Sequence, residues 1–172
     1  MGLLLVVAAL SACGGGDDGG GGGGSFGKAS DALKSGIHAQ CDKAFDCKAS
    51  YDPSMHDGNT FDAQYGTSAQ NCYDMTIALL EQFVGADYFD KIDASQSAGR
   101  IQYNASDAST CLDEETAMSC DVIFEQNGAV EADVPECDTA LVGTVQTGGA
   151  CTTDLDCATD GDSCDGDVCT AG

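Results

Sequence analysis

Hydrophobic residues recur at helical spacing in the first part of the chain. Between residues 25 and 50 they lie four positions apart, with Asp and Lys between them, which predicts an amphipathic helix with Ser30 as its N-cap. The apolar face of this helix comprises Leu33, Ile37, Cys41 and Phe45. Residues 51–65 contain Pro, Gly and Asn, and this composition predicts a loop.

The clearest helical pattern covers residues 68–84. Thr67 or Ser68 is suited to cap its start, and Gly85 is suited to end it. Its predicted buried face consists of Cys72, Met75, Leu79, Leu80 and Phe83. A further turn that packs on this face is predicted from Tyr88, Phe89 and Ile92.

A third helix is predicted at residues 106–120, after a short extended stretch at 101–103. Its inward residues are expected to be Ala108, Cys111, Leu112 and Met118. The sequence Asn104-Ala105-Ser106 matches a glycosylation acceptor, but we interpret it as the start of this helix. Further on, Val122–Phe124 and Val130 flank the turn pair Asn127-Gly128, which predicts two short strands.

The character of the chain changes after Pro135. Glycine becomes frequent, and from Cys151 onward only Leu155 and Val168 could fill a core. Disulfides, which contribute about 2–4 kcal/mol each, would then have to stabilise this part. We therefore predict a small, mainly α, disulfide-rich fold: a stapled helical domain at residues 25–135, followed by an irregular cysteine-rich tail at 136–172.

The N-terminus has the features of an export signal. Residues 1–10 read MGLLLVVAAL, an apolar run shorter than the roughly 20 residues that span a bilayer. The following segment, Leu10-Ser11-Ala12-Cys13, resembles the lipobox of bacterial lipoprotein precursors. This resemblance implies that residues 1–12 are removed as a signal peptide and that the thiol of Cys13 carries a lipid. The alternative is an ordinary signal peptide followed by an unrelated cysteine.

A glycine-rich tether follows the predicted anchor, so that residues 13–24 form one lipidated, flexible unit. Apart from Asp17 and Asp18, residues 14–24 are all Gly, and a coil of this length spans about 20 Å on average. Gly14 stands where an Asp would favour retention in the inner membrane under the sorting rule of enteric lipoproteins. The resemblance therefore favours a cell-envelope location, anchored in the outer membrane.

Ten of the 11 cysteines lie beyond Cys13, and this even number in an exported protein predicts five disulfides. Zinc is disfavoured, because its sites use Cys pairs two residues apart, and His38 and His56 complete no such pattern. The cysteines predicted to form disulfides are Cys41, Cys47, Cys72, Cys111, Cys120, Cys137, Cys151, Cys157, Cys164 and Cys169.

Charge narrows the range of partners. The chain has 6 Lys+Arg against 29 Asp+Glu, a formal net charge of −23. Nucleic acid is excluded, because phosphate binding needs clustered basic residues, and docking on anionic headgroups is disfavoured. Aromatic residues make up 6% of the chain and Trp is absent, so the core is thin and disulfides become more important.

Neither a catalytic motif nor a strong metal motif is present. His38 and His56 stand in no recognisable catalytic pattern, which predicts a non-enzymatic protein; an unrecognised envelope hydrolase is the alternative. No cofactor is predicted, although the tail resembles thrombospondin type 3 calcium repeats and calcium prefers such oxygen ligands. The candidate calcium ligands of a calcium-stabilised, adhesion-type module are Asp160, Asp162, Asp165 and Asp167.

Two resemblances cover most of the mature chain. The cysteine order over residues 41–172, with the stretches SAGRIQY at 97–103 and PEC at 135–137, is similar to uncharacterised cysteine-rich lipoproteins common in myxobacteria. No activity is known for that group.

The second resemblance concerns the tail alone. Residues 149–169 resemble half of the Dickkopf N-terminal cysteine-rich module, which binds extracellular proteins. This resemblance implies the crossed pairs Cys151–Cys164 and Cys157–Cys169. We therefore expect a binding or structural module, attached to the membrane by its lipid, with an extracellular protein or glycan as its ligand.

Overall fold

The computed structural model describes residues 26–125 and 134–172. The predicted signal peptide, Cys13 and the tether lie outside the described residues, as does the Asn127-Gly128 turn with Val130. In the described part the protein is mainly α-helical and rich in disulfides, as the sequence predicts. Every helix described there is too short or too polar to cross a bilayer.

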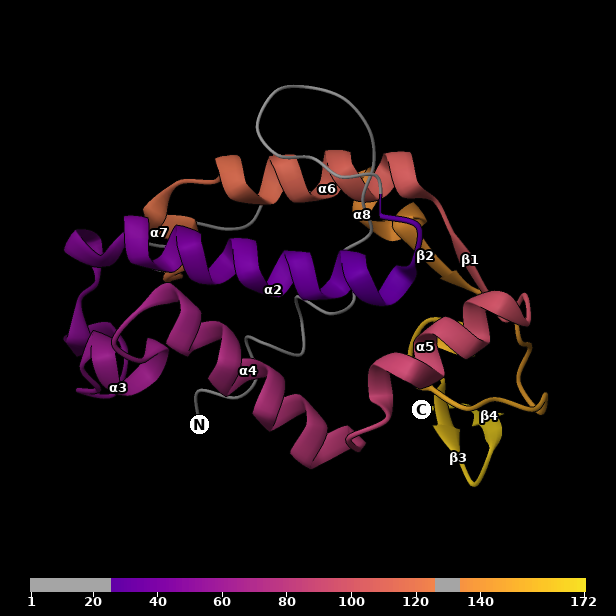
Figure 1. The fold of residues 1–172 in the computed structure, drawn as a ribbon. Helices are drawn as coiled ribbons and strands as arrows, with labels where there is room; N and C mark the ends of the chain where they lie inside the picture. Colours follow the sequence, from indigo (N-terminus) through magenta and orange to yellow (C-terminus); the bar gives the residue numbers. More distant parts are fainter. Residues whose placement is uncertain (1–25, 126–133) are drawn as a thin grey trace.

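Helix α2 (Ala29–Asp46) is the centre of the fold. It packs against α4 (Ala69–Val84) on one side and α6 (Ala105–Ala117) on the other, and α5 (Tyr88–Ser97) contacts it near its first turns (Figure 1). The main core forms between these helices. It contains Ala29, Leu33, Ile37, Leu80, Phe89, Ile92, Ile101, Cys111, Val134 and Cys137.

The prediction that Ser30 caps α2 is wrong. The helix begins one residue earlier, at Ala29, and Ser30 is 2% exposed within its first turn. The backbone N–H of Ala29 donates instead to the side-chain oxygen of Gln96 on α5, at 2.8 Å. A contact with a distant helix therefore satisfies the N-terminal donor that a local cap would otherwise take.

The ends of α4 are as predicted, but its buried face is only partly so. The hydroxyl of Ser68 accepts a hydrogen bond from the backbone of Asn71, and the helix ends at Gly85, which adopts a φ of 103°. Among the predicted face residues, Cys72 and Leu80 are buried, whereas Met75 and Phe83 are 38% and 64% exposed. Tyr73 and Ile77 pack on the core in their place. Figure 1 shows the last turn of α4 diverging from α2, and Phe83 in this turn is largely exposed.

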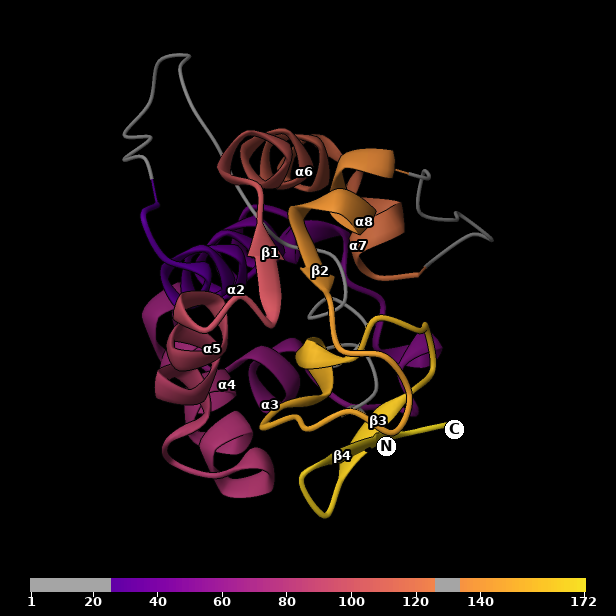
Figure 2. The ribbon, with the colours of Figure 1, turned by 90° about the vertical axis from the view of Figure 1, so that its right-hand side faces the viewer.

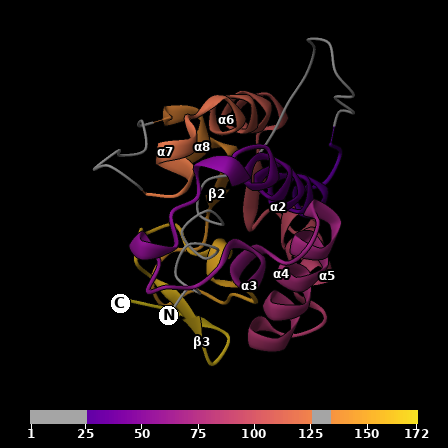
Figure 3. The ribbon, with the colours of Figure 1, turned by 90° about the vertical axis from the view of Figure 1, so that its left-hand side faces the viewer.

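Short helices occupy two regions that were predicted differently. The predicted loop at 51–65 contains the 3-10 turn Pro53–Met55 and helix α3 (Phe61–Tyr65), after the 3-10 turn Lys48–Ser50. The predicted strand at Val122–Phe124 is wrong, because helix α7 (Cys120–Ile123) covers most of it. A second, aromatic core explains both differences, because it buries Phe61 of α3 and Phe124, the residue that follows α7. Figure 3 views the molecule from the end where α3 and α7 lie. Its buried members are Ala44, Cys47, Phe61 and Phe124.

The third predicted helix is confirmed as α6. The side chain of Asn104 caps it by accepting from the backbone N–H groups of Ser106 and Asp107, so the sequon does mark a helix start. Ala108 and Cys111 are buried as predicted, and the remaining expected core residues, Leu112 and Met118, are half-buried.

The start of the tail is part of the helical body. The predicted boundary falls inside helix α8 (Pro135–Ala140), which packs on α6. Strand β2 (Leu141–Gly143) follows and pairs antiparallel with β1 (Ile101–Tyr103), with Gln102 opposite Val142. Figure 2 shows this pair standing between α6 and the rest of the tail.

The rest of the tail is a small knob with some regular structure. It contains the 3-10 turn η3 (Asp154–Asp156) and an antiparallel hairpin of β3 (Ser163–Asp165) and β4 (Val168–Thr170). An isolated bridge between Ala150 and Val168 extends this hairpin on the β4 side.

All ten cysteines beyond Cys13 are paired. The tail has the crossed connectivity that the Dickkopf-like resemblance implies, and no disulfide in the described residues joins the knob to the helices. The five disulfides are Cys41–Cys72, Cys47–Cys120, Cys111–Cys137, Cys151–Cys164 and Cys157–Cys169.

Candidate functional site

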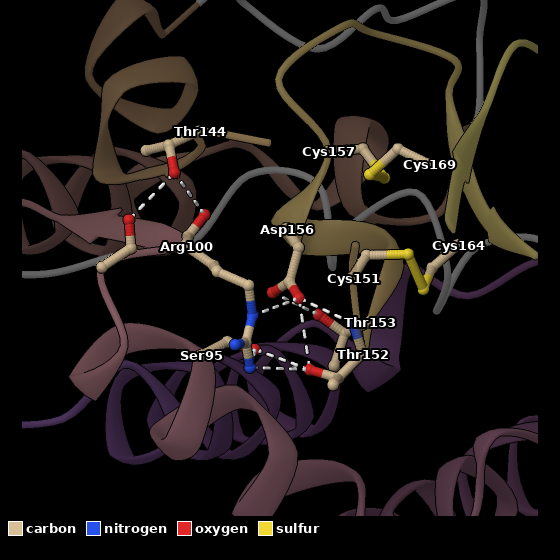
Figure 4. A network of polar contacts seen from close by, with 11 residues as sticks. Ser95, Arg100, Thr144, Cys151, Thr152, Thr153, Asp156, Cys157, Cys164 and Cys169 are labelled. Atoms are coloured by element: carbon tan, nitrogen blue, oxygen red, sulfur yellow. Dashed lines mark hydrogen bonds and ion pairs between the residues drawn. A yellow bond between two sulfur atoms is a disulfide. The ribbon is translucent and has the colours of Figure 1, made fainter. Parts of the chain in front are cut away.

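The most deeply buried charged group in the described chain is the carboxylate of Asp156 in η3, which has no exposed surface. Its Oδ2 accepts a hydrogen bond at 3.0 Å from Nε of Arg100, the residue before β1. The same oxygen accepts from the backbone N–H of Thr152 at 2.8 Å, and Oδ1 accepts from the hydroxyl of Thr153 at 3.2 Å. Figure 4 shows these donors converging on the carboxylate.

A second layer of polar contacts holds Arg100 in place. One terminal nitrogen of its guanidinium donates to the hydroxyls of Ser95 and Thr152, at 3.1 and 3.2 Å, and these two hydroxyls lie 2.8 Å apart (Figure 4). On the other side, the hydroxyl of Thr144 donates to the backbone carbonyl oxygens of Gly99 and Arg100. The network therefore connects α5, β1, η3 and the segment after β2.

Hydrogen bonding keeps Asp156 ionised. Burial alone would raise the pKa of this carboxyl, but the Ser95 hydroxyl, the Thr152 backbone N–H and the Arg100 guanidinium lower it below its ordinary value. Loss of a donor would leave this buried charge less well compensated and would destabilise the fold. The arrangement is suited to clamping the tail onto the helical body.

The two histidines lie in different surroundings. The Nδ1 of His38 on α2 is 3.0 Å from a carboxylate oxygen of Asp42, one turn further along. His56 stacks on the ring of Tyr51, with centroids 4.5 Å apart, and meets Phe124 edge-on. The structure therefore does not bring them together, and His56 belongs to the aromatic core.

The acidic residues proposed as calcium ligands lie around the β3–β4 hairpin. Asp160, Asp165 and Asp167 are exposed, and the carboxylate of Asp162 accepts a 2.6 Å hydrogen bond from Thr147. Within residues 26–125 and 134–172, no three carboxylates bring their oxygens within 4.8 Å of one another. Calcium binding at these residues stays the alternative to the predicted absence of a cofactor.

Two groups of potential ligand atoms do lie within 4.8 Å, and both include disulfide sulfurs. One consists of Cys151, Cys157 and Cys169, and the other of Cys111, Glu115 and Cys137. Metals bind cysteine as the thiolate, and a sulfur in a disulfide is not a thiolate. These groups are therefore disulfide neighbourhoods in the oxidised protein.

The basic side chains are confined to two stretches, residues 28–48 and 91–100, and the segments 49–90 and 101–172 contain no Lys or Arg. Most of them are engaged within the fold, and Lys34 lies 4.6 Å above the ring of Phe89. The ion pairs are Lys28–Asp93, Lys48–Asp62, Lys91–Asp87 and Arg100–Asp156. The acidic residues of the tail therefore have no Lys or Arg near them in sequence to balance their charge.

A shallow pocket of about 330 Å³ lies where the chain enters α2. It is bounded by Lys28 and Asp93, whose side chains form a 2.7 Å ion pair, and by Gln96. Its polar walls are already bonded to each other, so they orient the start of α2 on α5.

Sequence reasoning missed the clamp. Asp156 stands among several other acidic residues of the tail and is not singled out by any motif, whereas the structure buries it completely. One signal was available, because Arg100 is the last basic residue of the chain and stands directly before the buried residue Ile101 of β1.

Comparison with known proteins adds no relative: no family model, curated protein or solved structure matches this chain.

Proposed function

We propose that this protein is a non-enzymatic lipoprotein of the cell envelope, whose ectodomain is a binding or structural module for an extracellular protein or glycan. The observation that carries this proposal is the pairing of all ten cysteines beyond Cys13. Structural disulfides persist in oxidising compartments, which supports export. The lipobox-like segment before Cys13 supports attachment by a lipid, and Gly14 favours the outer membrane.

The use of polar groups in the fold supports a non-catalytic role. The buried Asp156 is held by donors from its own chain, and a carboxylate in that state has no access to a substrate. His38 and His56 each contact other residues in separate parts of the fold. A general base needs a neighbouring group to activate or orient it near a reacting atom.

The net charge of −23 supports attachment through the lipid rather than through the protein surface. An acidic ectodomain is repelled by anionic headgroups, so it should stand away from the bilayer on its tether. This arrangement suits a module that meets ligands outside the membrane.

Lipid attachment is tested by expressing the full chain in bacteria that are fed an alkyne fatty acid. The wild-type protein should label and sediment with membranes, and Cys13→Ser should lose both properties. Ser11→Ala, which keeps a small residue before the cysteine, is the matched control and should behave as wild type. Labelling of Cys13→Ser at the wild-type level would contradict the proposed anchor.

The binding role is tested with the soluble Cys13→Ser protein, added to cells that lack the gene. Saturable retention that excess unlabelled protein competes away is the expected result. Retention that rises linearly with concentration, without competition, would contradict a binding module.

A further inference from the structure

The two disulfides of the tail lie close to each other. The sulfur atoms of Cys151, Cys157 and Cys169 are all within 4.8 Å of one another, although Cys151 is bonded to Cys164 (Figure 4). A thiolate formed on Cys151 would therefore stand beside the intact Cys157–Cys169 bond. Thiol–disulfide exchange requires this kind of contact between an attacking sulfur and a disulfide.

The hairpin offers a second partner for Cys164. Cys164 of β3 lies directly opposite Cys169 of β4 in the antiparallel register. Residues directly opposite in such a pair have Cα atoms about 4.5–5.5 Å apart, which is within the range that a disulfide spans. The tail can thus accommodate Cys151–Cys157 with Cys164–Cys169 as well as the crossed pairs.

Solvent access determines which sulfur an external thiol reaches first. Cys151 and Cys169 are 3% and 1% exposed, whereas Cys164 is half-buried at the edge of the hairpin. Attack at Cys164 would release Cys151, the sulfur that stands next to the second disulfide.

We propose that the Cys151–Cys164 disulfide is a reactive site for small thiols, through which the tail exchanges between two disulfide connectivities. A thiolate attacks the sulfur of Cys164, forms a mixed disulfide there and releases the thiolate of Cys151. That thiolate attacks Cys157, so that Cys151–Cys157 forms and Cys169 leaves as a thiolate.

The thiolate of Cys169 then attacks the mixed disulfide at Cys164. Cys164–Cys169 forms and the original thiolate is released. Each step makes one S–S bond and breaks one, so the cycle consumes no oxidant or reductant. The external thiol acts as a catalyst, and the single proton lost when it ionises is regained when it is released.

Charge selects the class of thiol. Asp154 accepts a hydrogen bond from the backbone N–H of Cys164, Asp165 follows it in β3, and residues 101–172 contain no Lys or Arg. This negative field repels anionic thiols and attracts cationic ones. A cationic thiol such as cysteamine should therefore react several-fold faster than mercaptopropionate, and salt should reduce the ratio.

The exchange is tested with variants of the full chain that each replace one disulfide cysteine in a Cys13→Ser background. Cys164→Ser leaves a free thiol on Cys151. The matched control is Cys72→Ser, which leaves a free thiol on Cys41. In the described residues, Cys41 does not belong to a group of three ligand atoms within 4.8 Å of one another. Each protein is alkylated, digested with pepsin at low pH and mapped without reduction.

In Cys164→Ser, most of the label should move from Cys151 to Cys169 or Cys157, while in Cys72→Ser it should stay on Cys41. Label that stays on Cys151 would overturn the proposal. Equal scrambling in both variants would also overturn it, because exchange would then follow general unfolding. In the Cys13→Ser protein with all ten other cysteines, catalytic cysteamine should produce a Cys164–Cys169 peptide, and its absence would count against the proposal.

Discussion

The Nε of Arg100 lies 3.0 Å from Oδ2 of Asp156, across 56 residues of sequence. The side chain of Arg100 is 29% exposed and that of Asp156 is fully buried, so this ion pair is largely shielded from solvent. Because Arg100 precedes β1 and Asp156 ends η3, this ion pair joins the helical body to the tail. The two parts should therefore unfold together while the pair is intact.

Replacing Arg100 with Ala should destabilise the protein strongly. The substitution leaves the buried carboxylate of Asp156 without its charged partner, and such losses cost up to about 3 kcal/mol when one partner is partly exposed. Urea denaturation followed by circular dichroism measures the change. Lys91→Ala is the control, because its ion pair with Asp87 is exposed on both sides and should contribute less than about 1 kcal/mol. Equal effects of the two substitutions would contradict the assigned role of Asp156.

Acid should weaken the same contact. The pKa of Asp156 is lower in the folded state than the ordinary value of about 3.9, so its ionisation stabilises the fold above that pH. This stabilisation is lost as the pH falls below about 4 and through the lower folded value. The difference in unfolding free energy between wild type and Asp156→Asn should therefore shrink between about pH 5 and about pH 2. A difference that is constant over this range would contradict the lowered pKa.

Gly143→Ala should disrupt the contact between β2 and the tail. A Cβ at this position would overlap the backbone carbonyl of Cys157, which cannot move without shifting η3. Overpacking of this kind costs about 1–3 kcal/mol. The matched control is Gly27→Ala, where a Cβ meets no atom within 4 Å and the effect should stay within about 0.5 kcal/mol. Thermal denaturation of both variants checks the prediction, which would fail if Gly143→Ala melted like wild type.

Calcium should leave the melting temperature unchanged within about 1 °C. Asp162 already accepts a hydrogen bond from Thr147, and no three described carboxylates converge. A calcium site filled at 100 times its Kd would add about 2.7 kcal/mol, which would raise the Tm by several degrees. Melting in 1 mM calcium against EDTA distinguishes these outcomes, and such a rise would favour the calcium-stabilised alternative.

Local signals in the sequence predicted local structure well. Ser68, Gly85 and Asn104 act as helix boundaries because their side chains or backbone conformations settle the geometry within one turn. Phe83 was predicted to be buried because its spacing fits the apolar face, but burial also requires a neighbouring element, and α2 does not reach that turn.

Long-range partners were the part that the sequence could not supply. Nothing near Asp156 distinguishes it from the exposed acids around it, because its donor is 56 residues away. The aromatic core beside α3 and α7 likewise depends on a contact between Phe61 and Phe124, which are far apart in the sequence. The tail disulfides were predictable only because a resemblance supplied the order in which cysteines pair.

The uneven placement of the basic residues has a consequence for cleavage by proteases. Trypsin-like enzymes cleave after Lys or Arg and need several residues of extended, accessible chain around the cut. The basic residues lie within α2 or α5, within two residues of an end of α2, or directly before β1, and the last 72 residues contain none. The folded protein should therefore resist proteases of this class, whereas its unfolded chain would be cut only within residues 28–48 and 91–100.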